Sequence, residues 1–160
     1  MTGRVLGLDV GSRRLGVAVS DPSGTVASPL VTLARRGPAE DAGALGRLAT
    51  EQDATTVVVG LPLTLAGREG PAAGAVRAYL DQLRPLLPRL EFELTDERLS
   101  TVAAERALVA GGVRRQSRRA VVDQVAASLF LQAWLDATRA HQADRRGPGN
   151  PGGVPRWDRR

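Results

Sequence analysis

The chain contains no cysteine, no lysine and only one histidine, His141. Without cysteine it can form neither a disulfide framework nor a thiolate metal site. A single histidine near the end excludes a Ser-His-Asp triad in the core and a histidine-rich zinc site. A metal site in this chain would need oxygen ligands, and oxygen ligands favour Mg²⁺ or Mn²⁺.

Long apolar runs are also absent, because no stretch approaches the roughly 20 residues that span a membrane. The length of 160 residues, with 42% hydrophobic and 24% charged residues, fits one globular domain. The first strand-like run starts almost at the N-terminus, so we expect no leader peptide, a cytoplasmic location and no membrane partner. We expect the domain to cover residues 1–140 and a disordered tail rich in Gly, Pro and Arg to cover 141–160.

All 22 basic residues are arginines, and the formal net charge is +5. Arginine keeps its charge at any working pH and can grip a phosphate with two parallel hydrogen bonds. The excess favours a polyanionic partner such as nucleic acid, although any one arginine pair could equally be solvated surface charge. Adjacent arginines recur along the chain, at 13–14, 35–36, 114–115, 118–119, 145–146 and 159–160.

Hydrophobic periodicity and turn residues predict an α/β order of elements. The predicted strands cover 4–10, 15–20, 26–33, 56–60 and 91–95. The predicted helices cover 39–52, 71–84, a segment from Ser100 or Thr101 to about Ala110, and 117–138. Three antiparallel strands followed by alternating helices and strands indicate a mixed five-stranded sheet with helices on both faces.

Three acidic residues occupy positions where a folded protein rarely places a bare charge: Asp9, Glu97 and Asp123. Asp9 lies in an apolar strand, Glu97 follows the last strand, and Asp123 lies on the apolar side of the last helix. A buried carboxylate without a partner is costly, so one shared divalent-metal site explains all three economically. Each also has a structural explanation: hydrogen bonds from turn amides for Asp9, an arginine partner for Glu97, and the helix dipole for Asp123.

Four segments of the chain form an ordered set of motifs. They are residues 7–21 (GLDVGSRRLGVAVSD), 58–63 (VVGLPL) with Gly67 and 69–70, 96–101 (DERLST) and 123–127 (DQVAA). In this order they resemble the opening, second and third motifs and the final helix of the YqgF/RuvX family of pre-16S rRNA nucleases and Holliday-junction resolvases. Each motif is weak alone, but four in the family's order and spacing, within residues 3 to about 137, form a specific pattern.

The resemblance implies an RNase H-like fold, a divalent-metal site of Mg²⁺ or Mn²⁺, and catalytic and metal-binding roles for Asp9, Glu97 and Asp123. It implies a nuclease that matures the 5′ end of pre-16S rRNA during ribosome biogenesis, with pre-rRNA or ribosomal precursor particles as partners. Resolution of branched DNA and a non-catalytic RNA-binding role in ribosome assembly remain alternatives, and the oligomeric state stays open. An actin-like ATPase is less favoured, because it needs two copies of the fold.

Five arginines lie near these motifs and are expected to hold backbone phosphates without reading the sequence. They are Arg13, Arg14, Arg98, Arg114 and Arg115. The segment from Gly111 to Gln116 is interpreted as a loop that substrate could order.

Overall fold

The computed structural model describes residues 3–98 and 115–146, and the side chains of 115–122 and 146 are not among the described features. The elements follow in the order β1 (Arg4–Val10), β2 (Arg14–Ser20), β3 (Ala27–Ala34), α1 (Pro38–Glu51), β4 (Ala54–Leu61), α2 (Pro71–Leu83), the 3₁₀ turn η1 (Arg84–Leu86), β5 (Glu91–Asp96) and α4 (Arg115–Arg146). The strands form one five-stranded sheet in the order β3-β2-β1-β4-β5. β1 runs antiparallel to β2 and parallel to β4, so the sheet is mixed, as predicted.

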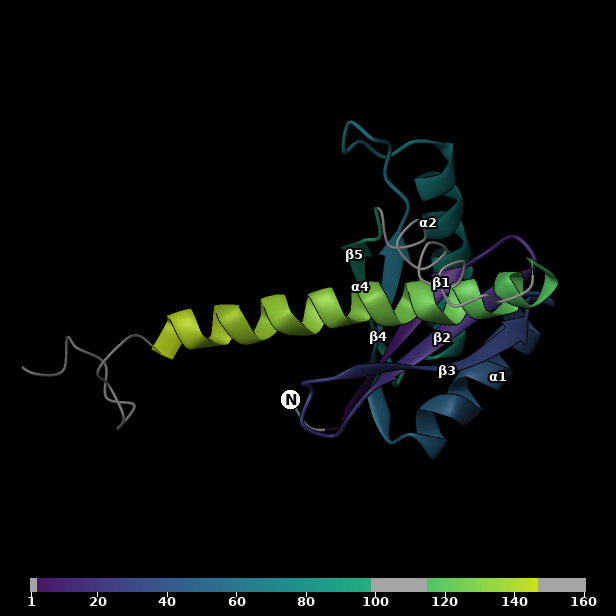
Figure 1. Cartoon of the computed structure of the whole chain (residues 1–160). Helices are drawn as coiled ribbons and strands as arrows, with labels where there is room; N and C mark the ends of the chain where they lie inside the picture. The colour runs from purple at the N-terminus through teal and green to yellow at the C-terminus, as the bar shows by residue number, and fades with distance from the viewer. Residues whose placement is uncertain (1–2, 99–114, 147–160) are drawn as a thin grey trace, which may run out of the picture.

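Two hydrophobic clusters cover the two faces of this sheet, because successive strand side chains point to opposite sides. Leu6 and Leu8 of β1 face the cluster that includes the buried side chains of α1 and α2. Val5 of β1 faces the second cluster, which α4 completes with Phe130 and Leu131. Figure 1 shows α4 crossing one face of the sheet, with α1 and α2 behind it. The prediction of helices on both faces is confirmed.

Proline and glycine set several of the element boundaries. α1 and α2 each have a glycine at the N-cap and a proline in the first turn, where the missing N–H costs no hydrogen bond. α2 ends at Leu83, and the chain continues into a 3₁₀ turn that contains Pro85. The bounds of these helices and of all five strands lie within two residues of the predicted ones.

α4 is longer than the predicted helix of 117–138, because it runs from Arg115 to Arg146. Its last turns therefore occupy the start of the stretch predicted as a disordered tail from residue 141. The reason is local: the glycines and prolines that break helices begin only at Gly147, after an alanine- and glutamine-containing stretch that suits a helix. These last turns extend past the edge of the sheet (Figure 1) and are largely exposed.

Two predictions lie outside the described residues: the helix ending near Ala110 and the glycine pair that follows it. Within the part of the chain that the structure describes, no helix is long and apolar enough to cross a membrane.

Candidate active site

Asp9 lies near the carboxyl end of β1, between one antiparallel and one parallel neighbour. Its direct cross-strand partner on β2 is Gly16. On β4 the parallel register pairs Leu8 with Val59, so the next residue, Gly60, lies beside Asp9 on the other side. Asp9 thus has a glycine on each flanking strand. Because strand side chains alternate, all three positions face α4.

The glycine on β2 lets α4 come into close contact with the sheet. A Cβ atom built on Gly16 would lie 2.3 Å from both the carbonyl carbon and the carbonyl oxygen of Asp123. Real Cβ atoms do not approach backbone so closely, so only glycine fits there. The main chain at Asp123 therefore rests directly on β2, beside Asp9. As predicted, Asp123 lies on the side of α4 that faces the sheet.

The glycine on β4 makes room for the third acidic residue. A Cβ atom on Gly60 would lie 2.4 Å from Oε2 of Glu97 and 2.8 Å from the ring of Phe130. Glu97 follows β5 directly, and its side chain reaches back across β4 towards Asp9. The three acidic residues thus gather on one face, at the end of the sheet where parallel strands of α/β proteins usually bind ligands.

Burial and mutual repulsion dominate the electrostatics of this cluster. Burial, followed by the negative charges of Glu97 and Asp123, raises the pKa of Asp9 from 3.8 to about 8. The Asp9 and Glu97 carboxyl groups also share a hydrogen bond, which raises the pKa of Asp9 and lowers that of Glu97. The hydrogen bond thus favours the protonated form of Asp9 and the ionised form of Glu97.

The other two carboxyl groups are shifted in the same direction. Burial, together with the charge of Asp96, raises the pKa of Glu97 despite its bond with Asp9. Burial also raises the pKa of Asp123, and the positive charge of Arg14 opposes that shift. Neither Asp9 nor Glu97 forms an ion pair within the described part of the chain. Among the described residues, the charge of Arg14 on Asp123 is therefore the positive charge that acts on the cluster.

The donor set suits a hard divalent cation, since all three groups are carboxylates and no soft ligand is present. A cation would offset the carboxylate repulsion that adds to burial in raising the pKa of Asp9. Among the described residues, no three acidic or histidine side chains already form a ready metal-binding group. Asp9 and Glu97 are joined by their hydrogen bond, whereas Asp123 acts on Asp9 only through its charge.

The predicted phosphate-binding arginines differ in their surroundings. Arg13 is exposed in the turn between β1 and β2, and Arg14 is close enough for its charge to act on Asp123. Arg98 pairs with Asp96 at 2.7 Å rather than with Glu97, and its guanidinium lies against Gly67. Arg114 and the side chain of Arg115 lie outside the described residues.

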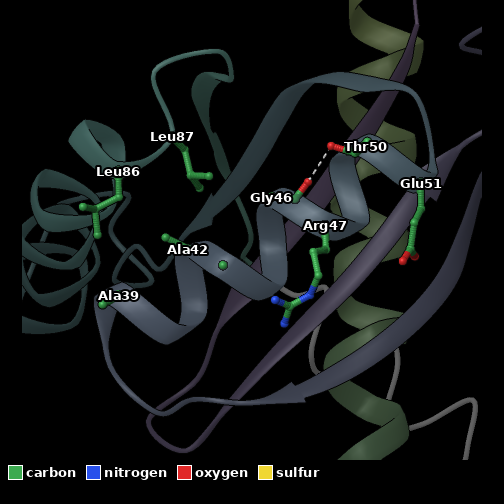
Figure 2. A pocket seen from close by; sticks show the side chains of 9 residues that line it. Ala39, Ala42, Gly46, Arg47, Thr50, Glu51, Leu86 and Leu87 are labelled. Carbon is green, nitrogen blue, oxygen red and sulfur yellow. Dashed lines mark hydrogen bonds between the residues drawn. The ribbon is translucent and has the colours of Figure 1, made fainter.

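A separate groove of about 720 Å³ lies on the outer side of α1, on the face of the sheet away from α4. Figure 2 shows its lining of small and apolar residues from α1, with Leu86 and Leu87 at the other wall. Arg47 and Glu51 are the charged residues in this lining. None of the three clustered carboxylates belongs to it.

Gly16 and Gly60 create the space for the acidic cluster, a role that the sequence patterns did not indicate. A further position of this kind is Gly7, where a Cβ atom would lie 3.1 Å from Ala127 of α4. The available signal was glycine inside a strand, which often marks a close approach of another segment. The segment that approaches could not be identified from the strand itself.

Comparison with known proteins identifies the family. Residues 3–137 match the family described as "RuvX: Holliday junction resolvase". A protein of Myxococcus xanthus named "Putative pre-16S rRNA nuclease" is 48% identical over 141 residues, covering 88% of this chain and 93% of its own length. A protein of the same name from Mycolicibacterium paratuberculosis is 49% identical over 138 residues, covering 86% of this chain and 83% of its own length.

Solved structures show the same fold at low sequence identity. RuvC of T. thermophilus, solved with a Holliday junction substrate, superposes with a TM-score of 0.52 at 18% identity, covering 85% of this chain and 96% of its own. The Fowlpox virus resolvase, solved with Holliday junction DNA, gives a TM-score of 0.51 at 8% identity, covering 84% of this chain and 98% of its own. The fold is therefore that of the RNase H-like resolvases, and the chain belongs to the RuvX family of nucleases.

Proposed function

We propose that this protein is a metal-dependent nuclease that hydrolyses phosphodiester bonds in the 5′-end maturation of pre-16S rRNA. The observation that supports this best is the acidic cluster of Asp9, Glu97 and Asp123, assembled over Gly16 and Gly60. The three carboxyl groups have raised pKa values, and none forms an ion pair within the described residues, where only Asp123 senses a nearby positive charge, that of Arg14. Such a cluster is costly in a purely structural role and suits a divalent cation. The names of the relatives supply the substrate class.

Asp9, Glu97 and Asp123 would hold Mg²⁺ or Mn²⁺. The chemistry that such ions supply in nucleases is activation of a water and stabilisation of the leaving oxygen. The residues themselves must first lose the proton that Asp9 shares with Glu97. Arg14 opposes the rise in the pKa of Asp123 and so helps to keep that carboxylate ionised.

The arginines of the site would hold the substrate by its phosphates. Arg13 is exposed one residue before Arg14, so it can contact the backbone of a strand bound at the acidic cluster. Arg98 is tied to Asp96, and a phosphate would have to compete with that carboxylate. Arg114 and Arg115 complete the proposed set. The setting is the bacterial cytoplasm, with pre-rRNA or ribosomal precursor particles as partners.

A second candidate is resolution of branched DNA, because the matching family is described as a Holliday junction resolvase. The same cluster could serve either substrate, since metal-assisted hydrolysis acts on the phosphodiester and not on the base.

A cleavage screen tests both candidates. Purified protein is incubated with RNA that carries the 5′ precursor segment of 16S rRNA and with four-way DNA junctions, in Mg²⁺, Mn²⁺ or EDTA. The proposal expects metal-dependent cleavage of the RNA that Asp9→Asn abolishes. Preferential cleavage of the junctions would favour the second candidate. Binding without any cleavage would indicate a non-catalytic RNA-binding protein and contradict the proposal.

A further inference from the structure

The turn between β1 and β2 connects two parts of the acidic site, because it follows Asp9 and leads into Arg14. The turn closes through a hydrogen bond of 2.8 Å from the Gly11 N–H to the Arg14 carbonyl oxygen. A Cβ atom on Gly11 would lie 2.8 Å from that same oxygen, so the turn is tightly closed. Any displacement of Gly11 would be transmitted to Asp9, two residues earlier in the chain.

Arg35, which follows β3, holds this turn at two points. Its main-chain N–H donates to the Arg13 carbonyl oxygen at 2.9 Å. Its guanidinium Nη1 donates to the Gly11 carbonyl oxygen at 2.8 Å, across 24 residues of sequence. Arg35 forms no ion pair within the described residues. Its charged group is thus directed at the main chain of the turn.

A buried pair of side chains supports the guanidinium from behind. The Arg35 guanidinium carbon lies 4.3 Å from the centre of the Tyr79 ring, a cation–π distance. The Tyr79 hydroxyl donates to Oδ2 of Asp41 at 2.7 Å. Tyr79 and Asp41 are only 4% and 2% exposed, so this contact is shielded from water. Burial and the neighbouring Asp41 raise the pKa of Tyr79, so the hydroxyl keeps its proton.

Asp41 closes the network by binding the main chain just after Arg35. It accepts hydrogen bonds from the Arg36 N–H at 2.9 Å and the Gly37 N–H at 3.3 Å. The end of β3, the start of α1 and the middle of α2 are therefore joined to the turn. No buried polar side-chain atom in the described residues lacks a hydrogen-bond partner. A fully satisfied buried network of this kind is rigid.

We propose that Arg35 is a positioning residue that fixes the turn after Asp9, and that Tyr79 and Asp41 hold Arg35 in place. The consequence for catalysis rests on the proposed nuclease function. The consequence for the turn does not, so the two can be tested separately. Arginine is suited to this role because its planar fork directs a donor at one carbonyl while its face stacks on an aromatic ring.

The first test measures amide hydrogen exchange by NMR in the full-length protein. Arg35→Met keeps most of the side-chain length but removes the donor and the charge. A lost charged hydrogen bond corresponds to about a tenfold change in a local equilibrium, so exchange of the Gly11 amide should accelerate about tenfold. The amide of Val58, in the middle of β4, should change much less.

A matched control and a milder variant keep this test decisive. Arg36→Met removes the same charge from the adjacent, exposed position and should leave the Gly11 amide unchanged. Tyr79→Phe removes only the hydroxyl and should accelerate exchange of the Gly11 amide to a smaller extent. This variant replaces Arg35→Met in the test if Arg35→Met does not fold. Unchanged exchange at Gly11 in both Arg35→Met and Tyr79→Phe would overturn the proposal. Equal acceleration at Gly11 and Val58 would show a purely global effect and would overturn it too.

The second test separates positioning from substrate binding in the cleavage assay. Arg35→Met should lower kcat about tenfold with KM changed less than about twofold, because it loses the guanidinium bond to Gly11, next to Asp9, but keeps the main-chain bond to Arg13. Arg35→Lys, which keeps a charge, should recover part of kcat. A change confined to KM would overturn the positioning role. If the wild-type protein cleaves nothing, the nuclease proposal fails, while the exchange test still decides the role of Arg35.

Discussion

At the scale of single residues, the carboxyl group of Asp9 is mostly neutral at pH 7. Burial and the charges of its neighbours raise its pKa to about 8, whereas an exposed aspartate has a value of 3.8. Between about pH 4 and pH 8, the folded protein therefore keeps this proton, whereas the unfolded chain has already released it. The contribution of this group to stability is complete below about pH 4 and is lost as the pH rises towards 8.

This linkage predicts the pH dependence of the metal-free protein. In EDTA, the free energy of unfolding should fall as the pH rises from about 4 to about 8, and the fall should be shallower in Asp9→Asn. Asparagine has nearly the same size and carries no charge, so it removes the titration while keeping the hydrogen-bonding capacity. Urea unfolding at several pH values measures the slope. Identical slopes in both proteins would contradict the assigned protonation of Asp9.

A second prediction concerns catalysis at the same residue. Loss of a metal ligand removes several kcal/mol of charge stabilisation, so Asp9→Asn should lower kcat at least about 100-fold. The fold should persist, as judged by circular dichroism. Cleavage at the wild-type rate by Asp9→Asn would exclude the proposed role of the cluster.

Binding of a divalent cation should offset the repulsion among the carboxylates of the acidic cluster. Because the proton on Asp9 must leave before a cation binds, Mn²⁺ affinity should rise between pH 6 and pH 8. Mn²⁺ at 100 times its Kd should stabilise the wild-type protein by about 2.7 kcal/mol. Thermal unfolding with and without Mn²⁺ measures this, and Asp9→Asn serves as the control. A Tm that Mn²⁺ raises equally in both proteins would place the bound ion elsewhere.

At the scale of elements, the acidic cluster depends on how closely α4 approaches the sheet. Gly7, Gly16 and Gly60 lie on three neighbouring strands and all face α4 or the Glu97 side chain. None of them has a positive φ angle, so the backbone would accept another residue. The requirement for glycine is therefore one of space.

Gly16→Ala should push α4 away from β2, because its Cβ would meet main-chain atoms of Asp123 at 2.3 Å. We expect it to destabilise the fold by about 2 kcal/mol or more, as overpacked cores do. Gly74→Ala, on the exposed side of α2 with no atom near its new methyl group, should instead stabilise by roughly 0.5–1 kcal/mol. Urea unfolding measures both. Equal effects of the two substitutions would contradict the close approach of α4.

At the scale of the whole molecule, the net charge of +5 coexists with an acidic site. The arginines near the site can offset its repulsion for a polyanion while leaving the carboxylates free for a cation. Arg13 lies in the turn that follows Asp9, and Arg14 begins β2, so both lie at the same end of the sheet as Asp9. We therefore expect these arginines to bring phosphates to the acidic cluster.

The salt dependence of binding tests this arrangement. The log–log slope of affinity against salt is about −0.7 per phosphate contact for a single strand and about −0.9 for a duplex. Arg13→Ala should weaken binding to all sequences alike and flatten the slope by the amount that corresponds to about one phosphate contact. Arg89→Ala, an exposed arginine before β5, should change neither. Equal slopes for wild type and Arg13→Ala would show that Arg13 is ordinary surface charge.

The sequence alone was enough to predict the order of the elements, the mixed sheet and the apolar side of the last helix on which Asp123 lies. Alternation within a strand and the spacing of apolar residues on a helix are local properties, so they can be read from neighbours in the chain. The predicted end of the last helix was wrong, because the Gly-, Pro- and Arg-rich composition was extended back to residue 141, whereas the glycines and prolines start only at Gly147. The four motifs also identified the family.

Only the tertiary structure decided how the three acidic residues meet. The strand register places Gly16 and Gly60 on either side of Asp9, and register is fixed by the packing of both sheet faces rather than by any single segment. The proton shared by Asp9 and Glu97 depends on burial, which no spacing in the chain reveals. The contacts among Arg35, Tyr79 and Asp41 were likewise decided only by the tertiary structure. They are far apart in sequence, and they meet because α1 and α2 pack on one face of the sheet while β3 ends beside the turn that follows Asp9.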